Sequence, residues 1–125
     1  MYTKGFQQYK EQSVESMTQA ELLLTLYDEL VKRLTHAEIA LEKKDYEMME
    51  AAVDRSNEII NYLRLTLSKA YEISGNLWQL YEFFGYELAR VKYGRNAEEL
   101  QRVKRMVCEL RDAFRIAAAN DAAGK

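Results

Sequence analysis

Apolar residues recur at steps of three and four positions along most of this chain, in four successive stretches. The first stretch starts at Thr18 and ends before a pair of lysines at 43 and 44. This period is typical of an amphipathic α-helix with one face buried. The stripe comprises Leu23, Leu26 or Tyr27, Leu30, Leu34, Ala37 and Leu41, and it is widened by Leu22, Leu24 and Val31. We therefore expect this helix to be apolar over more than half of its girth.

Three further stretches show the same period, and each predicts a helix with a single buried stripe. Their stripes comprise Met49, Ala52 or Val53, Ser56, Ile60, Leu63 and Leu67; then Leu77, Leu80 or Tyr81, Phe84, Leu88 and Val91; then Leu100, Val103, Val107, Leu110, Phe114 and Ala117. The first 17 residues show no sustained period. They are expected to form a flexible or docked arm.

Residues that favour helix starts precede three of the four stretches. Thr18 is followed three positions later by Glu21, which is the pattern of a capping box. Asp45 precedes the second stretch, and Asn96 precedes the fourth. Since these side chains accept hydrogen bonds from the first free amides of a helix, they predict starts next to these positions.

The boundaries of the third helix are less sharply marked. Either Ser74 or Asn76 suits its cap, and residues 71–73 either extend the second helix or form a loop. Gly94 suits the left-handed position after its end. Gly85 lies inside the helical pattern, where glycine is unfavourable, so we expect it either to pack closely against another helix of the bundle or to admit a ligand chain; the first is preferred.

Short connections between successive helices make them antiparallel neighbours. The sequence therefore predicts an all-α fold, an antiparallel up-down-up-down four-helix bundle with a short N-terminal arm. The expected organisation is an arm at 1–17, a bundle at 18–120 and a frayed tail at 121–125. With 125 residues the chain fits one domain, and the absence of proline, with only 5 glycines, argues against a fold rich in strands and turns.

Charge and composition narrow the class of partner. The net charge of −2 gives no basic surface for nucleic acid, and no apolar run approaches the ~20 residues that span a bilayer. Cys108 is the single cysteine, so no internal disulfide can form, and no signal peptide is visible. We expect a cytoplasmic protein that binds no nucleic acid and does not insert stably into a membrane.

The sequence contains few residues of the types that catalyse reactions or bind metals. His36 is the single histidine and has no glutamate three positions before it, so the ligand set of a di-iron bundle is missing. Cys108 has no histidine near it in sequence to activate it, and it is expected to be a buried or half-buried thiol. The carboxylates at 47, 50, 54 and 58 are expected to lie on a solvated face. We predict neither an enzyme nor a bound cofactor or metal.

Aromatic residues are in excess, with 9 tyrosines in the chain. Several large apolar residues fall outside the four stripes: Leu22, Leu24, Tyr62, Leu65, Trp78, Phe83 and Tyr86. Two interpretations stay open. These residues either form an exposed groove that binds another protein, or they are buried because the helices are rotated or widely covered.

Residues 16–28, which contain Thr18 and end in Leu26-Tyr27-Asp28, resemble the opening of the flagellar secretion chaperones of the FliS family. Tyr9 stands at the place of the family's N-terminal tyrosine. Further matches lie at 40–45, 59–63, 71–74 with 76–77, 80–82 and 109–114, so the resemblance covers about residues 9–115. The chain departs from the family pattern at Gln19, at Glu29 and along residues 83–93.

The resemblance implies a cytoplasmic chaperone that binds the disordered C-terminal segment of flagellin, prevents premature polymerisation and aids delivery to the flagellar export apparatus. It also implies that the N-terminal arm covers the client groove when no client is bound. The alternative is a generic helical-bundle interaction module or a homo-oligomer, for example a homodimer, with no flagellin client. The candidate protein-binding residues are Tyr9, Leu22, Leu23, Leu26, Tyr27, Asp28, Ile59, Leu63, Leu77, Tyr81 and Phe84. Tyr27 and Asp28 would equally suit a role in helix packing.

Overall fold

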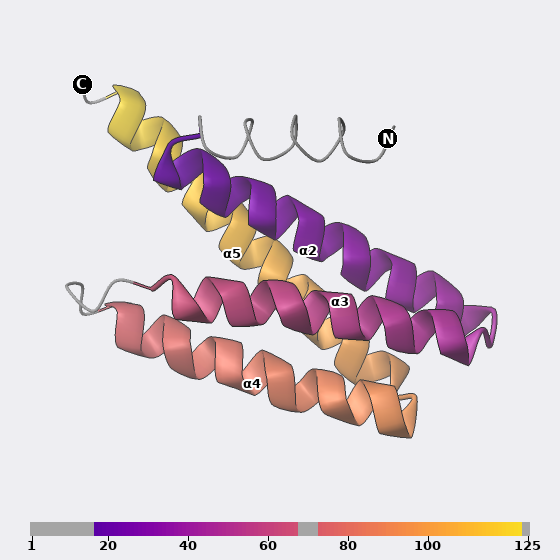
Figure 1. Cartoon of the computed structure of the whole chain (residues 1–125). Helices are drawn as coiled ribbons and strands as arrows, with labels where there is room; N and C mark the ends of the chain where they lie inside the picture. Colours follow the sequence, from indigo (N-terminus) through magenta and orange to yellow (C-terminus); the bar gives the residue numbers. More distant parts are fainter. Residues whose placement is uncertain (1–16, 68–72, 124–125) are drawn as a thin grey trace, which may run out of the picture.

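A computed structural model of the chain describes residues 17–67 and 73–123, and all of its regular elements in these ranges are helices (Figure 1). In chain order they are α2 (Gln19–Glu42), α3 (Tyr46–Leu65), α4 (Ile73–Gly94) and α5 (Ala97–Ala123). The predicted all-α fold is confirmed. Tyr9 and the rest of the predicted arm before Met17 lie outside the described residues, and the predicted domain boundary at residue 120 falls inside α5.

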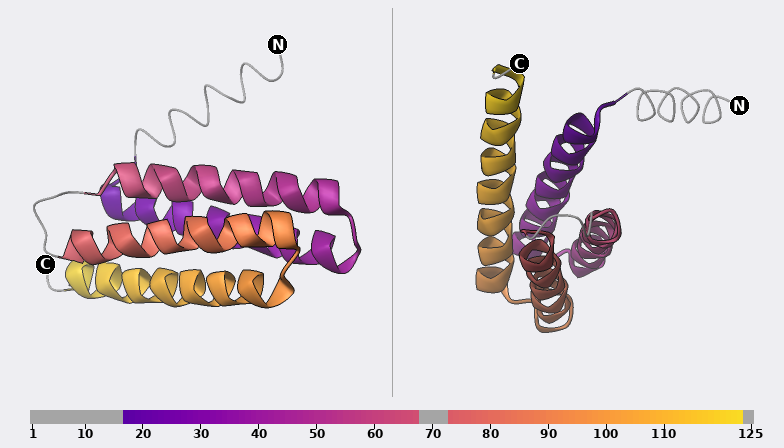
Figure 2. Two further views of the ribbon diagram at one scale, coloured as in Figure 1. Left: turned by 90° about the horizontal axis from the view of Figure 1, so that it is seen from below. Right: turned by 90° about the vertical axis from the view of Figure 1, so that its left-hand side faces the viewer.

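Each helix packs against the helices before and after it, and α5 returns to pack against α2. Because successive helices are joined by short connections, they run antiparallel, and the predicted up-down-up-down bundle is confirmed (Figures 1 and 2).

We name the two ends of the bundle by the turns and helix termini that lie there. The closed end holds the α2–α3 turn at 43–45 and the α4–α5 turn at 95–96. The open end holds the starts of α2 and α4 and the last turns of α3 and α5.

Three predicted caps are present. The side-chain oxygen of Thr18 accepts a hydrogen bond from the amide of Glu21 at 3.1 Å, and that of Asp45 accepts one from Met48 at 3.2 Å. Asn96 Oδ1 accepts from the amide of Glu99 at 3.1 Å. These bonds satisfy amides that the helices themselves leave free, so they fix where α2, α3 and α5 begin.

The predictions for the ends of α4 were wrong. The helix begins at Ile73, so Ser74 and Asn76 lie within its first turn instead of capping it. Gly94 is the last helical residue and has no positive φ, whereas Arg95 takes the left-handed conformation, with φ of 54°. The guanidinium of Arg95 lies 3.6 Å from the ring centre of Tyr46, and this cation–π contact between the two turns helps to offset the cost of that conformation.

The core is dense at the closed end and thins toward the open end. Of the predicted α5 stripe, Leu100, Val103 and Val107 are buried, but Leu110 and Phe114 are only half-buried and Ala117 is exposed. Figure 2 shows the reason, since α2 and α5 tilt away from α3 and α4 toward the open end. Leu110 and Phe114 pack against the edge of the core, so the predicted α5 stripe was wrong only at Ala117.

Gly85 does not mark a close approach between helices. A Cβ built on it would meet no atom within 4 Å, so the preferred explanation of close packing inside the bundle was wrong. The position faces open space on α4. Within residues 17–67 and 73–123, none of the helices combines the length and the apolar character needed to cross a bilayer.

Candidate functional site

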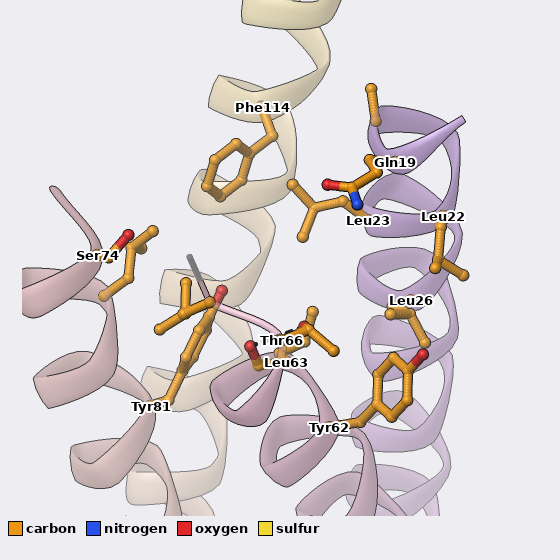
Figure 3. Close-up of a pocket in the computed structure, with 13 residues that line it drawn as sticks. Gln19, Leu22, Leu23, Leu26, Tyr62, Leu63, Thr66, Ser74, Tyr81 and Phe114 are labelled. Carbon is orange, nitrogen blue, oxygen red and sulfur yellow. Dashed lines mark hydrogen bonds between the residues drawn. The ribbon is translucent and has the colours of Figure 1, made fainter. Parts of the chain in front are cut away.

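The open end contains a cavity of about 470 Å³ between the four helices (Figure 3). Its walls come from the first turns of α2, the last turns of α3, the first turns of α4 and the ring of Phe114 on α5. The cavity is lined by Gln19, Ala20, Leu22, Leu23, Leu26, Tyr62, Leu63, Thr66, Leu67, Ser74, Leu77, Tyr81 and Phe114. Most of these side chains are apolar, which is typical of a binding site that gains its affinity from burial.

The cavity exists because apolar residues continue along the helices after the helices have separated. Leu22, Leu23 and Leu26 of α2 are half-buried, and so is Phe114 on the facing part of α5. Toward the closed end most stripe positions are fully covered, as at Leu34 and Leu100, although Leu41 is half-buried. The stripes therefore supply more apolar surface at the open end than the bundle itself can bury.

A pair of buried tyrosines lies at the base of the cavity, where Tyr81 lines it and Tyr27 supports Tyr81 from the core. The hydroxyls of Tyr27 and Tyr81 hydrogen-bond to each other, and the ring centre of Tyr27 lies 5.5 Å from that of Phe114. Burial raises the pKa of both hydroxyls above the ordinary value of 10.0, so both stay protonated at neutral pH. The pair therefore acts as a neutral support that joins α2 to α4, and it provides no base for catalysis.

Six of the predicted protein-binding residues line the cavity: Leu22, Leu23, Leu26, Leu63, Leu77 and Tyr81. Three others, Tyr27, Ile59 and Phe84, are core residues that do not line it, although Tyr27 supports its floor. That any of these residues contacts a client stays a prediction.

Asp28 is separate from the cavity. Its carboxylate is exposed and accepts a hydrogen bond from Arg115 at 3.2 Å, and Arg111 lies 3.8 Å away. Both arginines are on α5, so Asp28 joins α2 to α5 across the surface. This geometry fits the helix-packing role that its sequence position also allowed.

Several lining residues were not among the sequence candidates. Tyr62 is exposed and was visible in the sequence only as an apolar residue outside the stripes. Leu67 and Phe114 were assigned to the core stripes, and the divergence of α2 and α5 is what exposes them to the cavity. The polar residues at the rim, Gln19 and Ser74, carry no periodic signal that would have singled them out.

The large apolar residues outside the stripes are mostly exposed. Tyr62, Leu65, Trp78, Phe83 and Tyr86 all remain accessible, whereas Leu22 and Leu24 are half-buried. For the five exposed residues, the interpretation that rotated helices bury them was wrong. Three of the five, Tyr62, Leu65 and Trp78, lie at the open end, where they border hollows in the surface.

The closed end carries a different kind of group, a pair of buried carboxylates. Arg90 Nε donates to both oxygens of Glu99 at 2.8 and 2.9 Å, and Arg102 lies 3.6 Å from Glu87 Oε1. Burial raises the pKa of Glu87, and the hydrogen bond and charge of Glu99 raise it further against the effect of the two arginines. Glu87 Oε2 is buried with no hydrogen-bond partner, an environment that favours the neutral form of this carboxyl relative to an exposed one and agrees with the raised pKa.

The described residues show no constellation for metal binding. No group of three or more histidine, cysteine, aspartate or glutamate side chains comes together in residues 17–67 and 73–123. His36 is exposed and Cys108 is half-buried, the latter as predicted.

An open apolar cavity, with exposed aromatic and aliphatic side chains beside it, is typical of helical bundles that bind another polypeptide chain. Comparison of the chain with models of protein families identifies the family. The chain belongs to the family of the flagellar protein FliS, whose family model matches residues 2–121. The resemblance predicted from the sequence is confirmed.

Similar proteins agree with this membership. One relative, described as the flagellar secretion chaperone FliS of Bacillus subtilis (strain 168), is 27% identical over 113 residues, which cover 90% of this chain and 85% of that protein. A solved structure described as a flagellar chaperone from bacteria matches 96% of this chain and 99% of its own, with a TM-score of 0.77 at 16% identity. The structural match shows a shared fold. The similar proteins are described as chaperones, which is not a class of enzyme.

Proposed function

We propose that this protein is a cytoplasmic export chaperone that binds the disordered C-terminal segment of flagellin, prevents its premature polymerisation and aids its delivery to components of the flagellar export apparatus. Membership of the FliS family supports the proposal. The single observation that carries it is the cavity at the open end, where four helices present an apolar surface that they do not bury against one another.

Binding at this cavity would exchange a disordered client chain for apolar contacts. Ordering such a segment costs several kcal/mol, roughly 2–5, which must be offset by burying a large apolar area. The half-buried leucines Leu22, Leu23 and Leu26, together with Phe114, provide such an area on two facing helices. A client helix with apolar residues at positions i, i+3, i+4 and i+7 would place them toward this surface.

Isothermal titration calorimetry with the C-terminal peptide of the flagellin encoded in the same genome tests the proposal. We expect a complex of one peptide per chain, with a strongly negative heat-capacity change because apolar surface is buried. Leu23→Gln should weaken binding at least tenfold, roughly the loss of one apolar anchor. Ile39→Gln is the matched control, since Ile39 is an exposed aliphatic residue of the same helix near the closed end. Absence of binding at tens of micromolar peptide would refute this client.

The N-terminal arm with Tyr9 is part of the proposal, as a cover for the empty client site. A chain that lacks residues 1–15 should bind the peptide with equal or higher affinity, because no cover then has to be displaced. If this deletion prevents folding, the segment is structural and the cover is refuted. Urea denaturation of the shortened chain separates the two results.

A homodimer that buries its spare apolar residues against a second copy is the second candidate. The exposed residues Phe83, Tyr86 and Tyr93 of α4 are the observation that favours it. Light scattering of the chain alone over a range of concentrations distinguishes the two functions. A tight dimer at every concentration favours self-association, whereas a monomer that binds the peptide favours the chaperone.

A further inference from the structure

The outer face of α4 carries large side chains that the other three helices do not cover. Tyr86 is 62% exposed, Tyr93 is 80% exposed, and Phe83 beside them is 37% exposed. In the left view of Figure 2, α4 lies in front, between α3 and α5, with its outer face uncovered. The lining of the client cavity contains none of these three residues, so the proposed function gives this face no role.

The residues along this face have the spacing of a seam between paired helices. Glu82, Tyr86, Ala89 and Tyr93 follow one another at steps of four, three and four. Steps that alternate between three and four place side chains along one edge of a helix, as at positions a and d of a coiled coil. We call these four residues the outer seam.

The outer seam has space beside it for a second helix. Gly85 lies next to the seam, and a Cβ built on it would meet no atom within 4 Å. Ala89, one turn later, is a small residue between the bulkier Tyr86 and Tyr93. Because the distance between packed helices depends on the side chains at their contact, a large side chain of a partner helix fits opposite Ala89.

We propose that the outer seam binds the outer seam of a second copy of the chain, with the two α4 helices antiparallel. When the twofold axis lies between Tyr86 and Ala89, Tyr86 of each copy faces Ala89 of the other, so a large side chain meets a small one. Glu82 of each copy then faces Tyr93 of the other, where its carboxylate can accept a hydrogen bond from the phenol hydroxyl. Parallel helices would instead crowd Tyr86 against Tyr86 and bring the two like charges of Glu82 together.

The residues that flank the outer seam also match in the antiparallel arrangement. Phe83 and Arg90 lie on the same flank, seven residues apart. Antiparallel helices bring equal flanks together, so Arg90 of one copy faces the ring of Phe83 of the other. Nε of Arg90 donates to both oxygens of Glu99, at 2.8 and 2.9 Å, which holds the guanidinium on this flank. Two symmetric cation–π contacts therefore add to the pairing.

The outer seam is short, so the dimer should be weak. From Glu82 to Tyr93 it extends about 16 Å, and one such helix pair buries less than the roughly 1,200 Å² of a stable interface. We expect a dissociation constant on the order of tens to hundreds of micromolar. Antiparallel α4 helices point the two open ends in opposite directions. Both cavities then stay accessible, so this dimer accompanies client binding and does not replace it.

Sedimentation equilibrium of the chain without client, from micromolar to millimolar concentration, tests the inference. The unaltered chain should pass from monomer to dimer over this range. Tyr86→Glu places a charge at the centre of the outer seam and should weaken the dimer at least tenfold. Met48→Glu is the matched control, because Met48 is 58% exposed on α3, and it should leave the dissociation constant within about twofold.

Disulfide trapping tests the antiparallel arrangement, in chains that also carry Cys108→Ala. A mixture of Tyr86→Cys and Ala89→Cys chains should form the mixed disulfide readily, because these two positions face each other. Glu82→Cys alone should cross-link slowly, since about 16 Å of helix separates its two copies.

The outcomes separate this inference from the proposed function. A chain that stays monomeric at millimolar concentration would overturn the inference, and so would equal dimerisation of Tyr86→Glu and Met48→Glu. Rapid cross-linking of Glu82→Cys would show a parallel pair and overturn the arrangement. In calorimetry, Tyr86→Glu should bind the flagellin peptide like the unaltered chain; a loss of binding would assign the outer seam to the client instead. If the unaltered chain dimerises but does not bind the peptide, only the proposed function is refuted.

Discussion

The two ends of this bundle are built from the same kind of apolar stripe, yet the closed end buries its stripe more completely than the open end does. At the closed end, Leu34, Met49, Val91 and Leu100 from the four helices meet in a core that excludes solvent. At the open end, Leu23 and its neighbours continue the stripes, but α2 and α5 have tilted away and leave a cavity of about 470 Å³. The difference lies in helix direction, not in composition.

This comparison separates residues that stabilise the bundle from residues that are available for binding. Burial of an aliphatic side chain stabilises the fold by roughly 1.5–3 kcal/mol, so a half-buried residue contributes only part of that amount to the free energy of unfolding. The apolar surface that remains unburied on such a residue is available to a binding partner. The half-buried residues of the open end thus stabilise the isolated chain less than fully buried ones would, but their exposed surface can bind a partner.

The largest expected contrast between the ends comes from the same substitution at two places on α2. Leu34→Ala removes a fully buried side chain and should lower the free energy of unfolding by about 2–5 kcal/mol. Leu23→Ala, at the edge of the cavity, should lower it by less than about 1.5 kcal/mol. Urea denaturation measures both. Equal losses at the two positions would contradict the division into closed and open ends.

The hydroxyl pair beneath the cavity should show strong coupling. Tyr27→Phe leaves the buried hydroxyl of Tyr81 without its partner, and we expect a loss of about 1–3 kcal/mol. The double variant Tyr27→Phe with Tyr81→Phe removes both polar groups and should lose less than the sum of the single variants. Thermal or urea unfolding of the full cycle measures this coupling. Additive losses would show that the two hydroxyls do not depend on each other.

Gly85 offers a smaller gain in stability. A methyl group at this position meets no atom within 4 Å, so Gly85→Ala should stabilise α4 by up to about 1 kcal/mol. A rise in the midpoint of thermal unfolding is the expected result. Destabilisation would show that the helix needs the glycine for close packing, contrary to the structure.

The smallest effect concerns Glu87 at the closed end. Its pKa in the folded protein is raised above the ordinary value of 4.5, so its contribution to stability is fully present below that pH. The contribution is lost as the pH rises through the folded-state pKa. The unaltered chain should therefore lose stability relative to Glu87→Gln as the pH rises above about 4.5. Parallel unfolding curves for the two proteins across this range would contradict the raised pKa.

The helices and their order could be predicted from the sequence because period and caps are local properties. Thr18, Asp45 and Asn96 each accept a hydrogen bond from an amide three residues later, as their positions indicated. The start of α4 and the left-handed residue after it could not be predicted correctly. The contact of Arg95 with Tyr46 joins residues 49 positions apart, and no local pattern contains it.

The cavity could be predicted only in part, for a similar reason. An apolar stripe has the same appearance in sequence whether it meets a neighbouring helix or an empty space. Leu23 and Leu77 were placed among the binding candidates and do line the cavity, whereas Phe84 was placed there and is core. Whether a stripe residue lines the cavity or lies in the core depends on the angle between α2 and α3. That angle depends on packing throughout the bundle.

Hydrogen exchange of backbone amides, with and without the flagellin C-terminal peptide, tests whether the client binds at the open end, since it reports on both ends of the bundle in one measurement. We expect the peptide to slow exchange in the first turns of α2 and α4 and in the last turns of α3, while amides of the closed end around residues 34, 53 and 91 change little. Protection confined to the closed end, or spread evenly over all four helices, would contradict a client site at the open end.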